Sequence, residues 1–264
     1  MKSNKHIERD DNATKIFNDR SLANDYRTLK PLLQKGMRVL DVGCGTGAIS
    51  KDVAKLVGET GKVIGIDNTE KFILSGKETY ADVPNLELVH SDLFAFESTE
   101  PFDLIISART LQWLSDPKAA LLKMKEMLKP NGQISILDYN HEALAWNPNP
   151  PASMRSFYDT FLKWRADAGM SNRMADELAD LLKETGFAEI EVINSDECYD
   201  QSRANFHSKV GIWSKVAGST QMVKEGYLDN DLRLQAIEEY DKWVAQDAVS
   251  MTMKLNEVRG IKIG

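Results

Sequence analysis

Apolar runs of strand length alternate with stretches of helical period over residues 37–139. This alternation is typical of a parallel sheet that helices cover on both faces. The clearest helix is expected at 119–128, closed by the turn-forming residues 129–132. The pattern therefore predicts an α/β core. Its expected strands are MRVLDVG (37–43), KVIGID (62–67), LELVHSD (86–92), FDLIISA (102–108) and GQISILDY (132–139).

The segments that flank this core are expected to be mainly helical or irregular. In front of it, residues 8–30 form a polar helix-like segment that ends before Pro31, within an N-terminal helical cap over 1–36. Behind it, the proline-rich residues 140–151 predict a linker or the hinge of a lid, because proline suits neither a helix nor a central strand.

The rest of the chain predicts both helices and strands. Helices are expected at 152–168, at 172–185 and over a stretch of about 203–247, and strands at 188–199 and, antiparallel, at 251–263. We therefore expect one domain over residues 1–264. Its helical lid or substrate segments are expected at 140–187 and 200–248.

Composition narrows the class of protein. Of 264 residues, 42% are hydrophobic and 28% are charged, as in an ordinary globular protein. The 33 basic and 40 acidic residues give a net charge of −7, which argues against nucleic acid or an anionic membrane as a partner. No apolar run reaches the ~18 residues of a membrane span. Because the first residues are polar, we expect a cytoplasmic protein.

The two cysteines give no sign of a metal centre. Cys44 and Cys198 lie far apart and lack the spacing of metal ligands. We expect neither a disulfide framework nor a bound metal.

The first candidate for chemistry is a glycine-rich loop. Residues 39–50, VLDVGCGTGAIS, place a buried strand directly before three glycines and a helix. Glycine lets the backbone turn tightly and approach a ligand closely, because it has no Cβ. Gly43, Gly45 and Ala48 also satisfy a dinucleotide-binding fingerprint, so NAD remains an alternative ligand.

Acidic residues close the first three expected strands. Asp41, two residues before Gly43, can meet backbone donors of the loop or the ammonium group of a ligand. Asp67 ends the second strand, where a carboxylate can accept both hydroxyls of a ribose. Its spacing from Glu70 also fits a helix cap. Asp92 ends the third strand at the same sheet edge, within reach of an adenine amine.

Together with FDLIISARTLQWL (102–114) and LKPNG (128–132), these motifs resemble the class I S-adenosylmethionine-dependent methyltransferases. The resemblance covers about residues 37–139, with the motifs in family order and at family spacing. It implies a Rossmann-like, doubly wound, seven-stranded sheet whose last strand is antiparallel, with helical insertions after strands five and six. The LQWL stretch is similar to the trans-aconitate and biotin-pathway branch of small-molecule methyltransferases.

The resemblance also implies residue roles. Gly43, Gly45 and Gly47 would border the methionine part of S-adenosylmethionine, Asp67 its ribose and Asp92 its adenine amine. Asn68 and Leu93 would contact the adenine faces, and Ser107 would lie near the sulfonium. Separately, Tyr26 and Arg27 are candidates to close over the donor's carboxylate, although both can equally be surface residues. The candidate cofactor-binding residues are Tyr26, Arg27, Asp41, Gly43, Cys44, Gly45, Gly47, Asp67, Asn68, Ser91, Asp92, Leu93 and Ser107.

The candidate acceptor residues follow the fourth and fifth strands. His141 is the best candidate for a general base, and it can equally be a hydrogen-bonded loop anchor. A sulfonium methyl is already activated, so the reaction can also proceed by alignment without a side-chain base. An aromatic helix face, including Tyr158 and Trp164, is either substrate enclosure or core. The candidate enclosure residues are Trp113, Tyr139, Trp146, Phe157 and Phe161.

The sequence thus predicts a methyltransferase that uses S-adenosyl-L-methionine on a small-molecule acceptor, as a monomer or homodimer. A nucleic-acid or protein methyltransferase is one alternative, but the scattered basic residues do not indicate a basic groove. Two further classes stay open, an NAD-dependent oxidoreductase and a non-catalytic module that binds S-adenosylmethionine.

Overall fold

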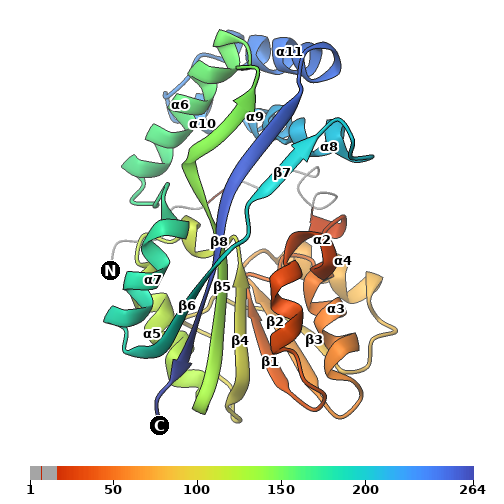
Figure 1. Ribbon diagram of the computed structural model, residues 1–264, viewed down its shortest axis with the longest axis vertical. Helices are drawn as coiled ribbons and strands as arrows, with labels where there is room; N and C mark the ends of the chain where they lie inside the picture. Colours follow the sequence, from red (N-terminus) through yellow and green to blue (C-terminus); the bar gives the residue numbers. More distant parts are fainter. Residues whose placement is uncertain (1–6, 8–16) are drawn as a thin grey trace.

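A mixed β-sheet runs through the lower half of the molecule and extends into its upper half (Figure 1). The structure is a computed structural model that describes residue 7 and residues 17–264. Within these residues the sheet has eight strands in the order β3-β2-β1-β4-β5-β8-β6, and β7 pairs with β8. The strands are β1 (Arg38–Val42), β2 (Lys62–Asp67), β3 (Leu86–His90), β4 (Phe102–Ala108), β5 (Leu128–Asn147), β6 (Phe187–Asn194), β7 (Glu197–Asp200) and β8 (Ser250–Lys262).

The predicted doubly wound architecture is confirmed. The pairs β3/β2, β2/β1, β1/β4 and β4/β5 are parallel, whereas β8 is antiparallel to both β5 and β6. The expected number of seven strands is one too low in the described part, because the stretch predicted as one strand at 188–199 divides into β6 and β7. Both of these strands pair with β8.

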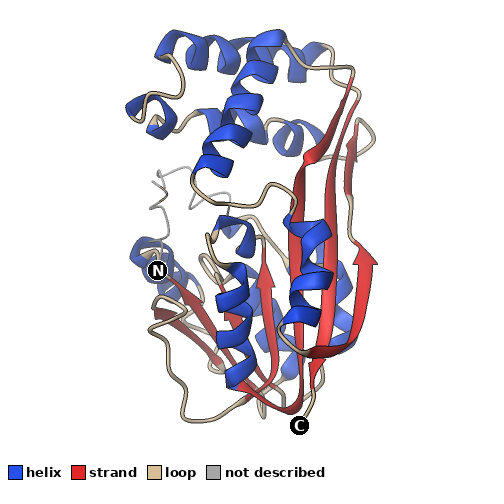
Figure 2. Cartoon of the chain, turned by 90° about the vertical axis from the view of Figure 1, so that its left-hand side faces the viewer, coloured by secondary structure: helices blue, strands red, loops and turns tan. Residues whose placement is uncertain are grey.

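Helices cover both faces of the sheet, and a second group of helices lies beyond its upper end (Figures 1 and 2). The helices of the lower half are α2 (Leu22–Asp25), the 3₁₀ helix η1 (Arg27–Leu32), α3 (Ala48–Val57), α4 (Glu70–Thr79), the 3₁₀ helix η2 (Leu111–Trp113), α5 (Pro117–Met127) and α7 (Met174–Glu184). The helices of the upper half, which we call the cap, are α6 (Ala152–Asp167), α8 (Phe206–Val210), α9 (Ile212–Ala217), α10 (Gln221–Lys224) and α11 (Asn230–Gln246).

The alternation of side chains along the central strands produces two cores. Val39 of β1 belongs to one apolar cluster, and its neighbours Leu40 and Val42 belong to the other. Successive side chains of a strand point to opposite faces, so a strand that is apolar throughout must be covered on both sides. The cluster that contains Val39 continues into the cap, where it includes Phe157 and Trp243. The cap and the sheet therefore share one core.

The cap stands on strands that continue from the sheet (Figures 1 and 2). The prediction of a linker or lid hinge at 140–151 is wrong for residues 140–147, because β5 runs through Asn147 and pairs with β8 as far as Ser250. The prolines begin only after this pairing ends, which explains why they do not prevent the strand. A register shift between Asn140 and Ala145 interrupts the ladder without ending it. A ribbon of β5 and β8, which β7 joins along residues 250–253 of β8, therefore replaces the predicted hinge.

Two helical predictions also differ from the structure. The single helical stretch expected at about 203–247 is four helices, and Gly211, Gly218 and Gly226 lie at the breaks, where glycine disfavours continuation of a helix. In the described part of the segment expected at 8–30, α2 is followed by η1, which contains Pro31 instead of ending before it. Residues 8–16 of that segment lie outside the described residues.

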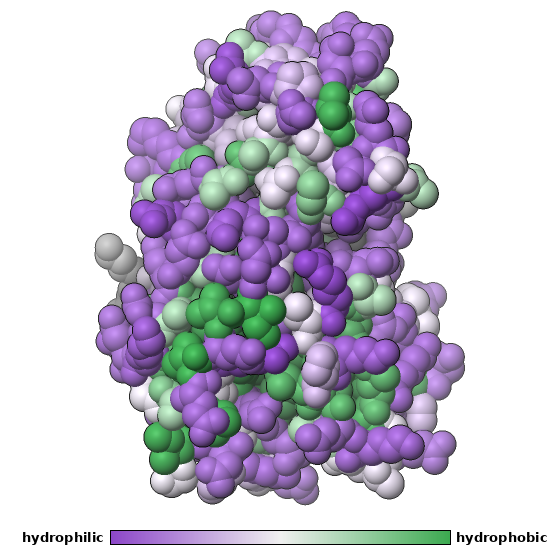
Figure 3. Space-filling view, in the orientation of Figure 1, coloured by the Kyte–Doolittle hydropathy of each residue, from purple (hydrophilic) through white to green (hydrophobic). Residues whose placement is uncertain are grey.

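The outer surface differs between the two halves in the view of Figure 3. The cap presents mainly hydrophilic side chains, whereas apolar side chains gather over the lower half. Among the described residues, no helix combines the length and the apolar character that crossing a membrane requires.

Candidate functional site

A cavity of about 800 Å³ lies between the carboxyl ends of strands β1 to β4 and the cap. Its lower lining includes Gly43, Asp67 and Asp92, which directly follow or end these strands. Its upper lining includes Phe161 of α6 and Trp213 of α9. In open α/β sheets, ligands bind beyond the carboxyl ends of the strands. The cavity therefore has the position and the size of a ligand site.

The glycine loop between β1 and α3 brings bare backbone against its neighbours. Gly43, Gly45 and Gly47 have φ angles of 74°, 59° and 80°, in the left-handed region that favours glycine. A Cβ on Gly43 would lie 2.2 Å from Thr110 Oγ1, and one on Gly45 would lie 2.7 Å from the Phe17 ring. Gly43 lines the large cavity, so a ligand there can approach the main chain closely.

Asp67 holds this loop in place. Its Oδ2 accepts a hydrogen bond from the amide of Gly45 at 2.9 Å, and its Oδ1 accepts one from the amide of Thr69 at 2.9 Å. The N-cap position of α4 is Thr69, so the expected cap formed by Asp67 and Glu70 is not found. Each carboxylate oxygen retains a further lone pair. Asp67 and the adjacent Asn68 line the cavity, as expected of residues that contact a nucleoside.

The end of β3 supplies the next group of polar atoms. Ser91, Asp92 and Leu93 all line the cavity. Asp92 Oδ1 accepts a hydrogen bond from the amide of Phe94 at 2.8 Å, which fixes the orientation of the carboxylate. Phe94 also lines the cavity and is 45% exposed, so an apolar ring lies at this edge.

Asp41 lies beside the large cavity. It lines a small recess together with Cys44 and Arg20, and the recess shares Gly43 with the large cavity. Burial raises the pKa of Asp41 to about 6, although the Ser50 hydroxyl, which donates to its Oδ2 at 2.6 Å, works in the opposite direction. Burial and the nearby carboxylates raise the pKa of the Cys44 thiol well above its usual value, so Cys44 is not a reactive thiolate.

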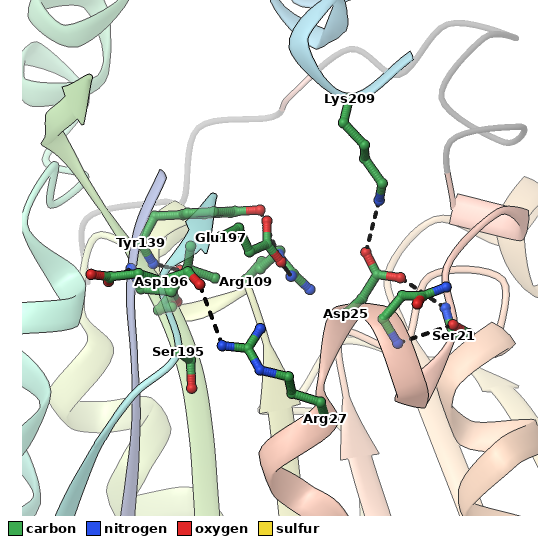
Figure 4. Close-up of polar contacts among 12 residues, drawn as sticks. Ser21, Asp25, Arg27, Arg109, Tyr139, Ser195, Asp196, Glu197 and Lys209 are labelled. Carbon is green, nitrogen blue, oxygen red and sulfur yellow. Dashed lines mark hydrogen bonds and ion pairs between the residues drawn. The ribbon is translucent and has the colours of Figure 1, made fainter. Parts of the chain in front are cut away.

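Five of the expected cofactor residues do not line the cavity or the recess, namely Tyr26, Arg27, Gly45, Gly47 and Ser107. Gly45 packs against Phe17 and Gly47 against Leu88. Tyr26 is buried, and its hydroxyl hydrogen-bonds with Ser135 Oγ at 2.7 Å. Arg27 extends away from the cavity and donates to the Asp196 carbonyl at 3.3 Å (Figure 4). Ser107 is fully buried and donates to the Val42 carbonyl at 2.7 Å. The structure thus places the side chains of Tyr26, Arg27 and Ser107 elsewhere than the sequence suggests.

The arginine of this segment that reaches the cavity is Arg20, whereas the sequence suggested Arg27. It lines both the large cavity and the recess, and its guanidinium carbon lies 4.4 Å from the centre of the Phe17 ring. Burial and the neighbouring Arg109 lower the pKa of Arg20. The ordinary pKa of an arginine is so high that the guanidinium of Arg20 stays cationic. Its polar surroundings in the sequence gave no signal that distinguished it from Arg27.

His141 lies in the cavity lining as a neutral anchor. Its backbone amide donates to the Asn172 carbonyl at 2.7 Å, and its Nε2 hydrogen-bonds with Gln112 Oε1. Arg165 Nη2 also donates to Gln112 Oε1, at 3.1 Å, so this oxygen is an acceptor and Nε2 of His141 carries the hydrogen. Burial, and then the positive charge of Arg165, hold the pKa of His141 well below its usual range. The anchoring interpretation is therefore favoured over a general base.

The aromatic candidates separate into two groups. Trp113, Tyr139 and Phe161 line the cavity. Phe157 is fully buried outside the lining, and Trp146 donates its indole N–H to the Tyr240 hydroxyl at 3.0 Å, also outside it. Residues four apart on a helix share a face, but only the C-terminal part of this face, with Phe161 and Trp164, reaches the cavity.

Trp213 is the main aromatic residue of the cavity that the sequence analysis missed. Its ring lies 4.6 Å from the Tyr158 ring and 5.8 Å from the Phe161 ring, in edge-to-face arrangements that favour both packing and a fixed orientation. The short helix α9 that carries it has too few residues for a clear periodic pattern.

A buried ion pair completes the site. Arg109 Nη2 donates to Glu197 Oε1 at 2.5 Å, and Arg109 Nε donates to the Tyr139 hydroxyl at 2.6 Å (Figure 4). Burial acts to lower the pKa of Arg109, but Tyr139 and Glu197 outweigh it and raise the pKa, so the guanidinium is always charged. Arg109 has a φ of 60°, an uncommon conformation for a residue other than glycine.

The described residues contain no group of three or more histidine, cysteine or acidic side chains arranged to hold a metal ion. The chemistry of the described lining is therefore that of hydrogen bonds, charges and aromatic rings. The acidic residues of the lining lie near the ends of β2 and β3, and the aromatic residues lie mainly near β5 and the cap.

The sequence comparison identifies the family of this chain. The sequence model described as a methyltransferase domain matches residues 33–202, more than half of the chain. The chain belongs to this methyltransferase-domain family. A demethylmenaquinone methyltransferase of Staphylococcus aureus (strain MRSA252) is 38% identical over 121 residues, which are 45% of this chain and 50% of that protein. The chain thus spans about half the length of the curated relatives it matches.

Solved structures share the fold. Phosphoethanolamine N-methyltransferase 2 of Haemonchus contortus, in complex with phosphomonomethylethanolamine and S-adenosylhomocysteine, has a TM-score of 0.58 at 17% identity, covering 91% of this chain and 52% of that chain. A SAM-dependent methyltransferase of Aquifex aeolicus has a TM-score of 0.55 at 21% identity, covering 97% of this chain and 100% of that chain. At these identities the likeness concerns the fold.

Proposed function

We propose that this protein transfers the methyl group of S-adenosyl-L-methionine to a small molecule. The observation that carries the proposal is the placement of Asp41, Asp67 and Asp92 at one edge of the sheet, around a glycine loop whose Gly43 lines the cavity. The match to the methyltransferase-domain family over 33–202 supports it. The relatives named above are described as acting on small molecules, which supports the same class of acceptor.

The residues of the lower lining fit the methyl donor. Asp67 would bind the ribose hydroxyls, and Asp92 the adenine amine. Asn68 and Leu93 would contact the adenine faces. The ammonium and the carboxylate of the methionine part would meet Asp41 and Arg20, which face the recess at the glycine loop. When bound, the donor supplies an activated methyl group on a positively charged sulfur.

The chain's own contribution to such a reaction is alignment and exclusion of water. The cap residues Phe161, Trp164 and Trp213 close the cavity from above with apolar rings. The anchoring bonds of His141 to Gln112 and Asn172 fix the loop below them. Correct alignment of two reacting groups can supply about 7–11 kcal/mol of the barrier. Fixed side chains are therefore sufficient for catalysis, and a side-chain base at His141 is not required.

The proposal extends to the setting of the reaction. We expect the whole chain to act as one methyltransferase domain in the cytoplasm, as a monomer or a homodimer, without nucleic acid. The net charge of −7 supports the last point.

Titration calorimetry with S-adenosylhomocysteine tests the proposal. We expect saturable binding that Asp67→Asn weakens, because the amide cannot accept from both the Gly45 and Thr69 amides and lacks the charge. Asp103→Asn is the matched control, because Asp103 accepts from the Arg38 amide and Lys129 at the opposite end of the strands. Absence of binding by the wild type, or preference for NADH in the same titration, would reject the proposal. A product assay with labelled methyl donor then distinguishes an enzyme from a binding module.

A further inference from the structure

The cluster around Arg109 retains two hydrogen-bond donors for a ligand. Among the described residues, Nη1 of Arg109 has no hydrogen-bond partner, although the atom is buried. The Tyr139 oxygen accepts from Arg109 Nε, so the hydroxyl hydrogen points elsewhere, and no residue in the described part of the chain accepts it. An unpaired buried donor normally costs stability and requires an explanation. Both side chains line the large cavity, so a ligand there can satisfy them.

These donors lie on the acceptor side of the cavity. Arg109 and Tyr139 do not line the recess that contains Asp41 and Arg20. The Tyr139 ring is instead 5.2 Å from the ring of His141, which lies 6.0 Å from the Phe161 ring and 6.1 Å from the Trp213 ring. The donors thus adjoin an aromatic enclosure, whereas Arg20 is available for the carboxylate of the methyl donor.

The charges around the donors favour an anion. Glu197 is engaged by Arg109 Nη2 and by the Tyr199 hydroxyl, which donates to its Oε2 at 2.8 Å. The acidic residues of the described cavity lining are Asp67, Glu70 and Asp92, all near the ends of β2 and β3. No carboxylate in the described lining therefore competes for Nη1 on the acceptor side. Asp25 and Glu197, which lie outside the lining, carry negative charge near Arg109, and the neighbouring Arg20 adds a second positive charge.

We propose that Arg109 and Tyr139 form a binding site for an ionised oxygen of the methyl acceptor. The acceptor is then a small, ring-bearing molecule that presents a carboxylate, an enolate or a phenolate to these two donors. A charge-assisted hydrogen bond from a guanidinium suits such an oxygen, and a second donor from Tyr139 fixes its direction. This inference rests on the proposed function, and it explains why a neutral His141 suffices, since the acceptor binds already ionised.

Calorimetric titration with 2-naphthoate and its neutral counterpart 2-naphthamide, each in the presence of saturating S-adenosylhomocysteine, tests the inference. We expect the wild type to bind 2-naphthoate at least about tenfold more tightly than 2-naphthamide, as for a hydrogen bond to a charged group. Tyr139→Phe should reduce the affinity for 2-naphthoate about three- to tenfold, through the loss of one neutral donor.

Variants of the ion pair supply matched controls. Arg109→Gln alone leaves Glu197 buried without its partner, and such a variant can fail to fold. The double variant Arg109→Gln/Glu197→Gln removes both charges, so it should lose the part of the preference for 2-naphthoate that the guanidinium supplies and keep only the smaller part that Tyr139 supplies. Glu197→Gln alone keeps the guanidinium but removes its countercharge, so it should strengthen binding of 2-naphthoate. These two variants alter the same buried pair and are expected to act in opposite directions.

Three results would overturn the inference. The first is equal affinity of the wild type for the two probes. The second is a preference for 2-naphthoate that survives undiminished in the double variant. The third is a double variant that loses affinity for S-adenosylhomocysteine instead of affinity for 2-naphthoate. The last result would assign Arg109 to the donor's carboxylate. Titration of 2-naphthoate without S-adenosylhomocysteine separates the two proposals. Binding of 2-naphthoate by a protein that does not bind S-adenosylhomocysteine would reject the proposed function and would leave an anion site that is not an acceptor site.

Discussion

Gly76 offers a stringent test of how the glycine loop is supported. This residue lies in the middle of α4, where a change to alanine favours a helix by about 1 kcal/mol. A Cβ at Gly76 would, however, lie 2.2 Å from the Thr46 carbonyl oxygen and 2.6 Å from Leu88 Cδ1. Thr46 belongs to the glycine loop, so α4 packs directly against the backbone of the proposed donor site. Gly76→Ala should therefore disturb both stability and binding.

The magnitude follows from the geometry. Ordinary van der Waals contact begins at 3.4 Å, so 3.4 − 2.2 gives a shortfall of 1.2 Å against a backbone atom that cannot rotate away. Overpacking of a core costs about 1–3 kcal/mol, and an immovable obstacle places this variant near the upper end. After subtraction of the helix propensity, the net loss is about 2 kcal/mol. For a domain of this size that lowers the Tm by roughly 4–8 °C.

Thermal unfolding and calorimetry with S-adenosylhomocysteine measure both effects. Gly58→Ala is the control, because Gly58 has a φ of 71° and a Cβ added there would meet nothing within 4 Å. Because Gly58 has a ψ of −178°, in a region that is almost exclusive to glycine, we expect Gly58→Ala to cost about 1–3 kcal/mol from backbone strain alone and to leave the affinity unchanged. If Gly76→Ala unfolds at a higher temperature than the wild type, helix propensity outweighs the contact and the reasoning is refuted.

Three further outcomes are expected. Asp41 has a pKa of about 6 and must be ionised to attract an ammonium group, so affinity for S-adenosylhomocysteine should fall roughly tenfold from about pH 7.5 to about pH 5. Calorimetry of Asp41→Asn should show no such fall. Burial raises the pKa of Asp138 from 3.8 to about 7, so the free energy of unfolding of the wild type should decrease relative to that of Asp138→Asn as the pH rises from about 4 to about 7. Denaturant unfolding would contradict this if the difference between the two free energies stayed constant over that range. Trp213→Ala should lower the free energy of unfolding by about 3–5 kcal/mol, since Trp213 is 3% exposed, while donor binding is retained in the same calorimetric assay.

The central sheet is predictable because its signals are local. β1, β2 and β4 are largely apolar on both faces, the edge strand β3 is half-exposed, and the turn or glycine signals that bound each strand lie within a few residues. The placement of Asp67 and Asp92 in one cavity follows from this topology alone, because parallel strands end at the same edge. The nucleoside side of the site is therefore largely readable from the sequence.

The acceptor side is not readable in the same way. Arg109 acquires its role through Glu197, which is 88 residues away and belongs to a strand of four residues. Arg20 and Arg27 have similar polar neighbours, and only packing on Phe17 directs Arg20 to the cavity. The prolines at 148–151 suggested a linker, whereas the preceding residues pair with β8 across a register shift. Contacts of this range and irregular registers leave no periodic signal.

The ribbon of β5 and β8 determines what the cap can do. A hydrogen-bonded ladder joins the cap to the sheet, and the opposite side is joined by Lys209 of α8, whose Nζ lies 3.1 Å from Asp25 Oδ1 of α2 (Figure 4). A partly exposed ion pair of this kind contributes about 0–1 kcal/mol, far less than a run of ladder hydrogen bonds and a shared apolar core. Any separation of the cap from the sheet must therefore begin on the side of Lys209 and pivot about the ribbon. The aromatic residues of the cap and the Tyr139 and Glu197 side chains, which β5 and β7 carry, then keep their relative positions better than either keeps its position relative to the glycine loop.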